Sequence, residues 1–121
     1  MDISKWILIV EDEQYQSKTL SLILEKTGYQ VSIAASSEEA CIDLQNQYYD
    51  LVLLDLHLDR VYGLELLEQI QGCNPETKIL IVTGNISQEV QQDALQRGAD
   101  GIIYKPVSPP ELLDKISLIL S

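Results

Sequence analysis

Short apolar runs alternate along this chain with longer segments in which apolar residues recur at helical spacing. The runs are mostly apolar with little alternation, which is typical of strands buried on both faces of a parallel sheet. We expect strands at residues 5–10, 30–34, 50–55, 78–83 and 101–104. Because parallel neighbours need crossover connections, this pattern predicts an α/β fold with a parallel sheet covered by helices on both faces.

Five helices are expected between and after these strands, at residues 14–27, 36 to about 47, 63–71, 87–97 and 108–120. Ser36 with Glu39, and Ser108 with Glu111, have the spacing of a capping box, which marks a helix start. Glycine often ends a helix, and the predicted ends are marked by Gly28, Gly72 and Gly98.

Composition fits one folded domain and narrows the range of partners. The 121 residues are 45% hydrophobic, without a repeat or linker, so we expect a single domain over residues 1–121 and no output domain. A net charge of −11 argues against direct binding of nucleic acid. No apolar run approaches the ~20 residues that cross a bilayer, and no signal segment opens the chain, so a cytoplasmic location without membrane contact is expected. Cys41 and Cys73 are expected to be free thiols.

Four of the apolar runs end on residues that can handle charge. Glu11-Asp12, Asp55, Thr83 and Lys105 each follow or close a run. Each has an ordinary structural interpretation by itself: acids favour helix starts, Asp favours turns, Thr fills strands and Lys is usually solvated. Ligands of open parallel sheets, however, bind beyond the carboxyl ends of the strands, where these residues would meet. Carboxylates from two strands would repel one another there without a cation.

This set of groups suits a divalent cation and a phosphoryl group. Mg²⁺ prefers carboxylate oxygens, and Glu11 and Asp12 stand together as a metal pair, with Asp55 beside them. Asp55 stands alone, so we expect it to be the nucleophile that forms an acyl phosphate. Lys105 would pair with Asp55 and then with a phosphoryl oxygen. The Thr83 hydroxyl would donate a hydrogen bond to the phosphoryl group, and the neighbouring Gly84 would allow a close approach.

Four motifs in order make the chain resemble the receiver domains of response regulators from about residue 5 to residue 120. They are ILIVEDE, DLVLLDLHL with Gly63 following, ILIVTGN and GADGIIYKP. The resemblance implies a flavodoxin-like, doubly wound sheet of five strands in the order 2-1-3-4-5. It also implies a signalling switch that accepts a phosphoryl group on Asp55 from a sensor histidine kinase or a phosphotransfer protein. The partner that reads the switch would be a downstream protein or an output domain, and the only reactions catalysed would be phosphorylation and dephosphorylation of the chain itself.

The resemblance assigns further roles around the pocket. The backbone carbonyl of His57 would complete the Mg²⁺ ligands, while the side chains of His57 and Asn85 would tune the lifetime of the phosphoryl group. The Lys105–Pro106 peptide bond would be cis. An X–Pro bond has by itself only about a 5–6% chance of that geometry.

The chain departs from the family pattern at three positions. Asp59 stands where a proline is common, and Tyr62 stands where an aspartate often precedes the glycine. Ile102 occupies the place of the family's switch aromatic, so the usual coupling between Thr83 and that ring is not expected here. Tyr104 is an aromatic neighbour of Lys105, but it lies two residues further along the strand and need not replace that ring.

Two other classes of function are alternatives: a degenerate receiver, and an enzyme of another class on the same fold, such as a phosphatase or a flavin protein. A degenerate receiver would only bind partners, and Ile102 weakly favours it, whereas the intact Asp55, Thr83 and Lys105 oppose it. A phosphatase of the haloacid dehalogenase type would need a second aspartate where His57 stands. A nucleotide or flavin site would need a glycine-rich loop where the chain has residues 11–13, which are all acidic.

Overall fold

The computed structural model describes residues 4–57 and 63–121, and the predicted alternation of strands and helices is confirmed there. The elements in chain order are β1 (Trp6–Val10), α1 (Gln14–Lys26), β2 (Gln30–Ala34), α2 (Ser37–Asn46), β3 (Leu51–Leu54), α3 (Gly63–Cys73), β4 (Lys78–Thr83), α4 (Gln88–Gln96), β5 (Gly101–Tyr104) and α5 (Pro109–Leu120). No helix in this described part of the chain combines the length and apolar character needed to span a membrane.

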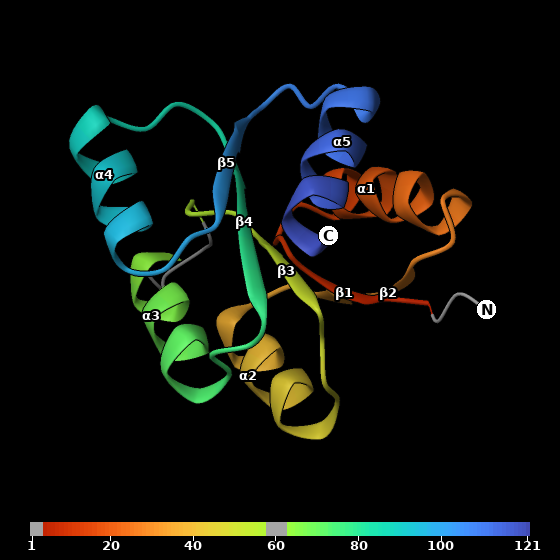
Figure 1. Cartoon of the computed structure of the whole chain (residues 1–121), viewed down its shortest axis with the longest axis horizontal. Helices are drawn as coiled ribbons and strands as arrows, with labels where there is room; N and C mark the ends of the chain where they lie inside the picture. The colour runs from red at the N-terminus through yellow and green to blue at the C-terminus, as the bar shows by residue number, and fades with distance from the viewer. Residues whose placement is uncertain (1–3, 58–62) are drawn as a thin grey trace.

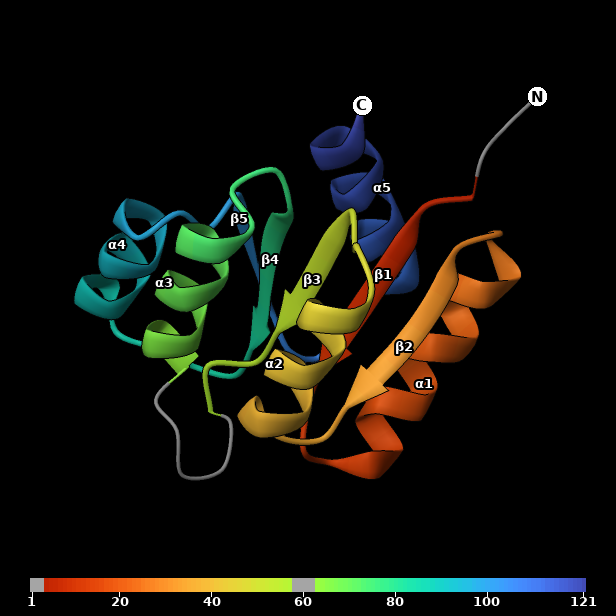
Figure 2. The same cartoon turned by 90° about the horizontal axis from the view of Figure 1, so that it is seen from below.

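The five strands form one parallel sheet in the order β2-β1-β3-β4-β5, as the resemblance implied. Helices α1 and α5 cover one face and α2, α3 and α4 cover the other (Figure 1). The arrowheads of the strands point to the same edge of the sheet (Figure 2). Residues that follow different strands are therefore brought together at that edge.

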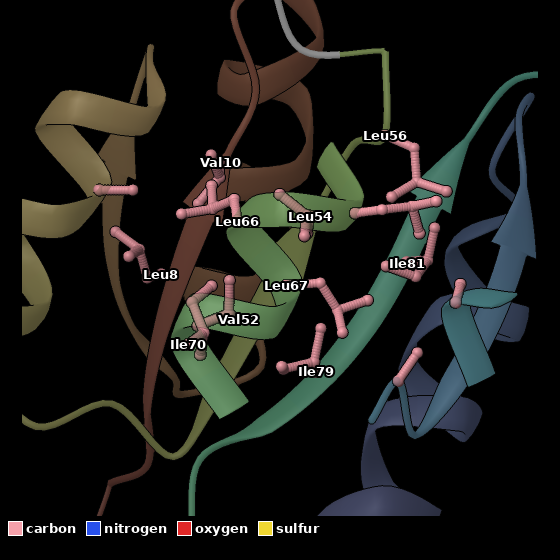
Figure 3. Packing of buried hydrophobic residues seen from close by; sticks show 14 of the residues in the cluster. Leu8, Val10, Val52, Leu54, Leu56, Leu66, Leu67, Ile70, Ile79 and Ile81 are labelled. Atoms are coloured by element: carbon pink, nitrogen blue, oxygen red, sulfur yellow. The ribbon is translucent and has the colours of Figure 1, made fainter. Parts of the chain in front are cut away.

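Both faces of the sheet are buried, which explains why the strand sequences are continuously apolar. Successive residues point to opposite faces: Leu8 and Val10 of β1 lie in the cluster under α2, α3 and α4, whereas Ile7 and Ile9 lie under α1 and α5. In the first cluster Leu66, Leu67 and Ile70 of α3 pack over Val52, Leu54, Ile79 and Ile81 (Figure 3). Leu20, Leu24, Leu112 and Ile116 fill the second.

The predicted serine caps are present. The Ser36 hydroxyl accepts from the Glu39 N–H at 3.2 Å, and the Ser108 hydroxyl accepts from the Glu111 N–H at 3.5 Å. Gly28 and Gly98 have φ angles of +104° and +117°, a region that glycine adopts without steric cost. These two glycines therefore end α1 and α4 as predicted.

The predicted end of α3 at Gly72 is wrong. The helix continues to Cys73, and Gly72 lies inside it without a positive φ. The Asn74 N–H still donates to the Ile70 carbonyl at 2.7 Å, so the helical bonding persists past the glycine. Pro75 follows at once, and the residue before a proline is disfavoured in the α conformation. The proline, rather than the glycine, ends this helix.

The third strand is also shorter than predicted, because Asp50 and Asp55 lie just outside it. Asp50 Oδ2 instead accepts from the Trp6 N–H at 2.8 Å, and Asp100 Oδ2 likewise accepts from the Ile79 N–H at 2.8 Å. The two aspartates satisfy backbone donors at the amino-terminal edge of the sheet, far from the edge where Asp55 lies.

Candidate functional site

Four side chains from four strand ends converge at the carboxyl edge of the sheet. Glu11 follows β1, Asp55 follows β3, Thr83 closes β4 and Lys105 follows β5. The Lys105 ammonium donates to Glu11 Oε1 at 2.7 Å and to Asp55 Oδ2 at 3.0 Å. The Thr83 hydroxyl donates to Asp55 Oδ1 at 2.9 Å. Sequence reasoning expected these residues at one place, and the structure joins all four in one chain of hydrogen bonds, from Glu11 through Lys105 and Asp55 to Thr83.

The backbone holds these residues in place, since each is bonded to the neighbouring strand. The Glu11 N–H donates to the Ala34 carbonyl at 3.0 Å, and the Asp55 N–H donates to the Val10 carbonyl at 3.2 Å. The Lys105 N–H donates to the Thr83 carbonyl at 2.7 Å. The pocket is thus built on the ends of the ladder itself.

Asp55 is buried, at 6% exposed, and receives three hydrogen bonds from described residues. Besides those from Thr83 and Lys105, its Oδ1 accepts from the His57 N–H at 2.9 Å. Burial acts to raise the pKa of Asp55, but the His57 N–H, the Lys105 ammonium and the Thr83 hydroxyl outweigh it and hold that pKa below its usual value. The carboxylate is therefore ionised at neutral pH, the form that a nucleophile requires.

Glu11 has the opposite shift. Burial at 3% exposed raises its pKa, and this outweighs the bonds from Lys105 and from the Glu13 N–H; repulsion from Asp55 adds to the rise. For Lys105, burial acts to lower the pKa, but the bonds to Glu11 and Asp55 raise it above the usual value. One charged ammonium therefore neutralises part of two carboxylates.

The carboxylates fit a Mg²⁺ ion only as a partial cage. Among residues 4–57 and 63–121, no three His, Cys, Asp or Glu side chains are grouped so that they could hold a metal ion. Asp12, which follows Glu11, is exposed. Mg²⁺ usually takes one or two protein carboxylates and keeps several waters. A pair drawn from Glu11, Asp12 and Asp55 meets that need without a closed three-carboxylate site.

The third acid of the run has a different role. Glu13 is the N-cap of α1, and its carboxylate accepts from the Tyr15 and Gln16 N–H groups at 3.2 and 3.1 Å. The helix-start interpretation of the acidic run thus holds for Glu13, whereas Glu11 turns into the pocket. The signal for Glu13 was its place directly before a helix.

His57 and Asn85 lie together at the rim. His57 Nε2 is 3.2 Å from the Asn85 carbonyl, so the ring joins the loops after β3 and β4. A Cβ added to Gly84 would lie 3.9 Å from the His57 ring, an ordinary contact distance. A Cβ at Gly63 would meet the Leu56 backbone at 2.6 Å, so the start of α3 packs directly against the residue after Asp55 and requires glycine.

The remaining predicted positions have mixed outcomes. The Lys105–Pro106 peptide bond is cis, as the resemblance implied. Ile102 is partly buried against the core under α3 and α4. Asp59 and Tyr62 lie outside the described residues.

A groove of about 540 Å³ opens beside the pocket, between α1 and the segment that joins β5 to α5. Its lining is largely apolar and reaches Lys105; it is formed by Glu13, Tyr15, Gln16, Thr19, Leu20, Ile23, Lys105, Pro106 and Val107. Sequence reasoning did not find this groove, because it depends on how α1 sits against a loop far along the chain.

Comparison with known proteins gives consistent results. The family model of the response regulator receiver domain matches residues 7–117. The alginate biosynthesis transcriptional regulatory protein AlgB of Pseudomonas aeruginosa is 39% identical over 106 residues, which are 88% of this chain and 24% of AlgB. The response regulator ArlR of Staphylococcus saprophyticus is 39% identical over 94% of this chain and 51% of its own length.

Solved structures give the same picture. A CheY-like response regulator receiver domain protein from Methanospirillum hungatei JF-1 has a TM-score of 0.94 and 40% identity, with 98% of this chain and 94% of that chain covered. The chemotaxis protein CheY4 of Vibrio cholerae has a TM-score of 0.92 and 28% identity, with 98% and 100% covered. This chain spans about a quarter to a half of the curated relatives AlgB and ArlR.

Proposed function

We propose that this chain, which belongs to the response regulator receiver domains, is a signalling switch that accepts a phosphoryl group on Asp55. The observation that carries the proposal is the set of contacts on that carboxylate: Lys105 on one oxygen, and Thr83 with the His57 N–H on the other. These donors keep Asp55 ionised and lie where negative charge on a transferring group would develop.

The reaction we infer is transfer from the phosphohistidine of a sensor histidine kinase or a phosphotransfer protein. An oxygen of Asp55 bonds to phosphorus, while the bond from phosphorus to the histidine nitrogen breaks and its electron pair stays on the imidazole. Lys105 and Thr83 then donate to phosphoryl oxygens. Hydrolysis reverses the state when water attacks phosphorus and Asp55 leaves as a carboxylate. We propose no reaction on other substrates.

Magnesium would be held by a pair of carboxylates drawn from Glu11, Asp12 and Asp55, together with the backbone carbonyl of His57. When bound, the ion would neutralise charge on the phosphoryl oxygens. The residues of the chain position the nucleophile and stabilise charge. The strand ends fix Asp55 in position, and Lys105 shifts its contacts from the carboxylates of Glu11 and Asp55 to the phosphoryl group.

The groove beside Lys105 is the place where we propose that the phosphodonor docks. It opens next to the pocket, and its largely apolar lining could accept the side chains of a helix that carries the phosphohistidine. Tyr15, which is 77% exposed, stands on its wall and would be buried by such a partner.

The direct test is to add Mg²⁺ and a small acyl-phosphate donor and to measure the intact mass. We expect one added phosphoryl group, its loss in Asp55→Asn and its loss when EDTA removes the metal. Asp50→Asn is the matched control, since Asp50 lies at the other end of the same strand and should leave labelling unchanged. Absence of an adduct, where another receiver domain is labelled, would favour a module that only binds partners.

A further inference from the structure

Tyr104 connects the pocket to the surface of the molecule. It is the last residue of β5 and directly precedes Lys105. In the sheet its partner is Thr83, and the Lys105 N–H donates to the Thr83 carbonyl at 2.7 Å. Partners in a parallel ladder point their side chains to the same face. Tyr104 therefore stands beside both residues that would contact the phosphoryl group.

The side chain of Tyr104 reaches helix α4. Its hydroxyl donates to Gln91 Oε1 at 2.6 Å, which joins β5 to the first half of that helix. Tyr104 is 39% exposed, so the ring lies over the surface between the strand and the helix. A tyrosine side chain has only two side-chain torsions, so it is a rigid connection between the strand and the helix.

Ile102 offers no such connection. It is paired with Ile81, further from the end of the sheet, and is packed against the core with no polar atom on its side chain. At its far end α4 has a polar contact of another kind, from Arg97 to Glu68 of α3 at 3.6 Å. Helix α4 is thus bonded near its start to β5, the strand that precedes Lys105, and at its end to the neighbouring helix α3.

We propose that the Tyr104–Gln91 hydrogen bond couples the position of α4 to the state of the Asp55 pocket. This inference rests on the proposed function, because it assumes that Lys105 and Thr83 move when Asp55 carries a phosphoryl group. Any shift of the paired backbone at Thr83 and Lys105 also shifts Tyr104, and the bonded hydroxyl carries that shift to Gln91. Tyr104 acts as a positioning residue and does not touch the transferred group.

The test distinguishes the effect of the Tyr104–Gln91 hydrogen bond from the effect of the tyrosine ring and from the effect of charge on α4. Tyr104→Phe keeps the ring and removes the hydroxyl, and Gln91→Met removes the acceptor. Gln91→Glu keeps an acceptor oxygen at the same place. Gln92→Met is the matched control, because Gln92 is the exposed neighbour on the same helix. For each variant, amide spectra are recorded without and with Mg²⁺ and beryllofluoride, and the phosphoryl adduct is measured by mass with the acyl-phosphate donor.

We expect all six proteins to form the adduct: the parent, the four single variants and the double variant Tyr104→Phe/Gln91→Met. In Tyr104→Phe and Gln91→Met the ligand-induced amide shifts of residues 88–96 should fall to half or less of the parent values, and the double variant should lose no more than either. Gln91→Glu and Gln92→Met should keep the parent shifts. Since each protein is compared with its own free state, a purely structural effect cancels.

Three results would overturn the coupling and leave the proposed function intact. The first two are parent-like α4 shifts in Tyr104→Phe and an equal loss in Gln92→Met. The third is an additive loss in the double variant, because the effects of two residues that act through one bond do not add. A parent protein that forms no adduct would instead contradict the proposed function itself.

Discussion

At the scale of single residues, the pocket depends on one ammonium group. Lys105 contacts Glu11 and Asp55, both nearly fully buried, and the pKa values of these acids shift in opposite directions. Among the described residues, Asp55 accepts hydrogen bonds from His57, Thr83 and Lys105, and these outweigh the effect of burial on its pKa. Glu11 accepts from the Lys105 ammonium and the Glu13 N–H, and these do not outweigh the effect of its burial. The removal of Lys105 would take from these two buried carboxylates the positive partner that they have among the described residues.

Lys105→Met should therefore destabilise the fold more at neutral than at acidic pH. We expect a loss of about 2–3 kcal/mol at pH 7, below the ~3–5 kcal/mol typical of breaking a fully buried pair, because Lys105 is partly exposed. Without the ammonium, the pKa of each acid in the folded state would be higher than in the parent protein, because Lys105 acts to lower both. An acid whose pKa is raised by folding contributes its full stability at pH values below its pKa in the unfolded chain. That stability is lost as the pH rises through its pKa in the folded protein. Urea unfolding at pH 7 and pH 4.5 measures the difference.

In the parent protein, the stability that Asp55 contributes should have the opposite dependence on pH. The pKa of Asp55 in the folded protein is lowered, so its contribution is present above its pKa in the unfolded chain and is lost as the pH falls through its pKa in the folded protein.

Lys5→Met is the control for the Lys105→Met prediction, because Lys5 is half exposed and contacts Asp50 only at 4.0 Å. A Lys105→Met loss that is equal at both pH values, or no larger than that of Lys5→Met, would contradict this electrostatic account.

The sequence predicted which residues meet in the pocket but not how they contact one another. Strand ends of a parallel sheet share one edge, so the positions of Glu11, Asp55, Thr83 and Lys105 followed from the runs before them. The bridge from Lys105 to both acids, and the bond from Tyr104 to Gln91, depend on side-chain reach across the sheet register. No spacing along the chain encodes these distances.

At the scale of elements, continuous apolar runs and serine caps were sufficient to predict the ten helices and strands of the described residues. The errors concern element ends, namely the short third strand and the end of α3 at Gly72. Glycine has two uses that look alike in sequence: it ends a helix when φ is positive, and it only weakens a helix when φ is ordinary. Gly28 is of the first kind and Gly72 of the second. Local composition cannot separate them, because the angle is set by where the helix packs.

The two glycines should respond oppositely to substitution by alanine. Gly72→Ala should stabilise the protein by about 0.5–1 kcal/mol, because the site is helical and an added Cβ meets nothing within 4 Å. Gly28→Ala should destabilise it by about 1–2 kcal/mol, although space is equally open there, because φ is +104°. Urea-unfolding midpoints of both variants give the comparison. A destabilising Gly72→Ala would show that Gly72 acts as a helix end after all.

At the scale of the whole molecule, the net charge of −11 and the acidic pocket act together. An acidic surface attracts any cation weakly. The pocket is more specific, because the carboxylates of Glu11 and Asp55 lie together there on one ammonium, and Asp12 follows Glu11 in the chain. Binding of Mg²⁺ to the folded form alone should stabilise the fold by mass action. This stabilisation can be distinguished from general screening of charge by a change of one pocket residue.

Thermal unfolding in MgCl₂ and in NaCl of matched ionic strength should separate the two effects. At ten times its dissociation constant, Mg²⁺ should add about 1.4 kcal/mol, or about 5 °C in Tm for a chain of this size. Asp12→Asn should remove most of that increment, whereas Asp114→Asn, with the same loss of charge on α5, should keep it. Equal increments in the two variants would place the bound ions on the general surface, because a pocket ligand must matter more than a remote acid of equal charge.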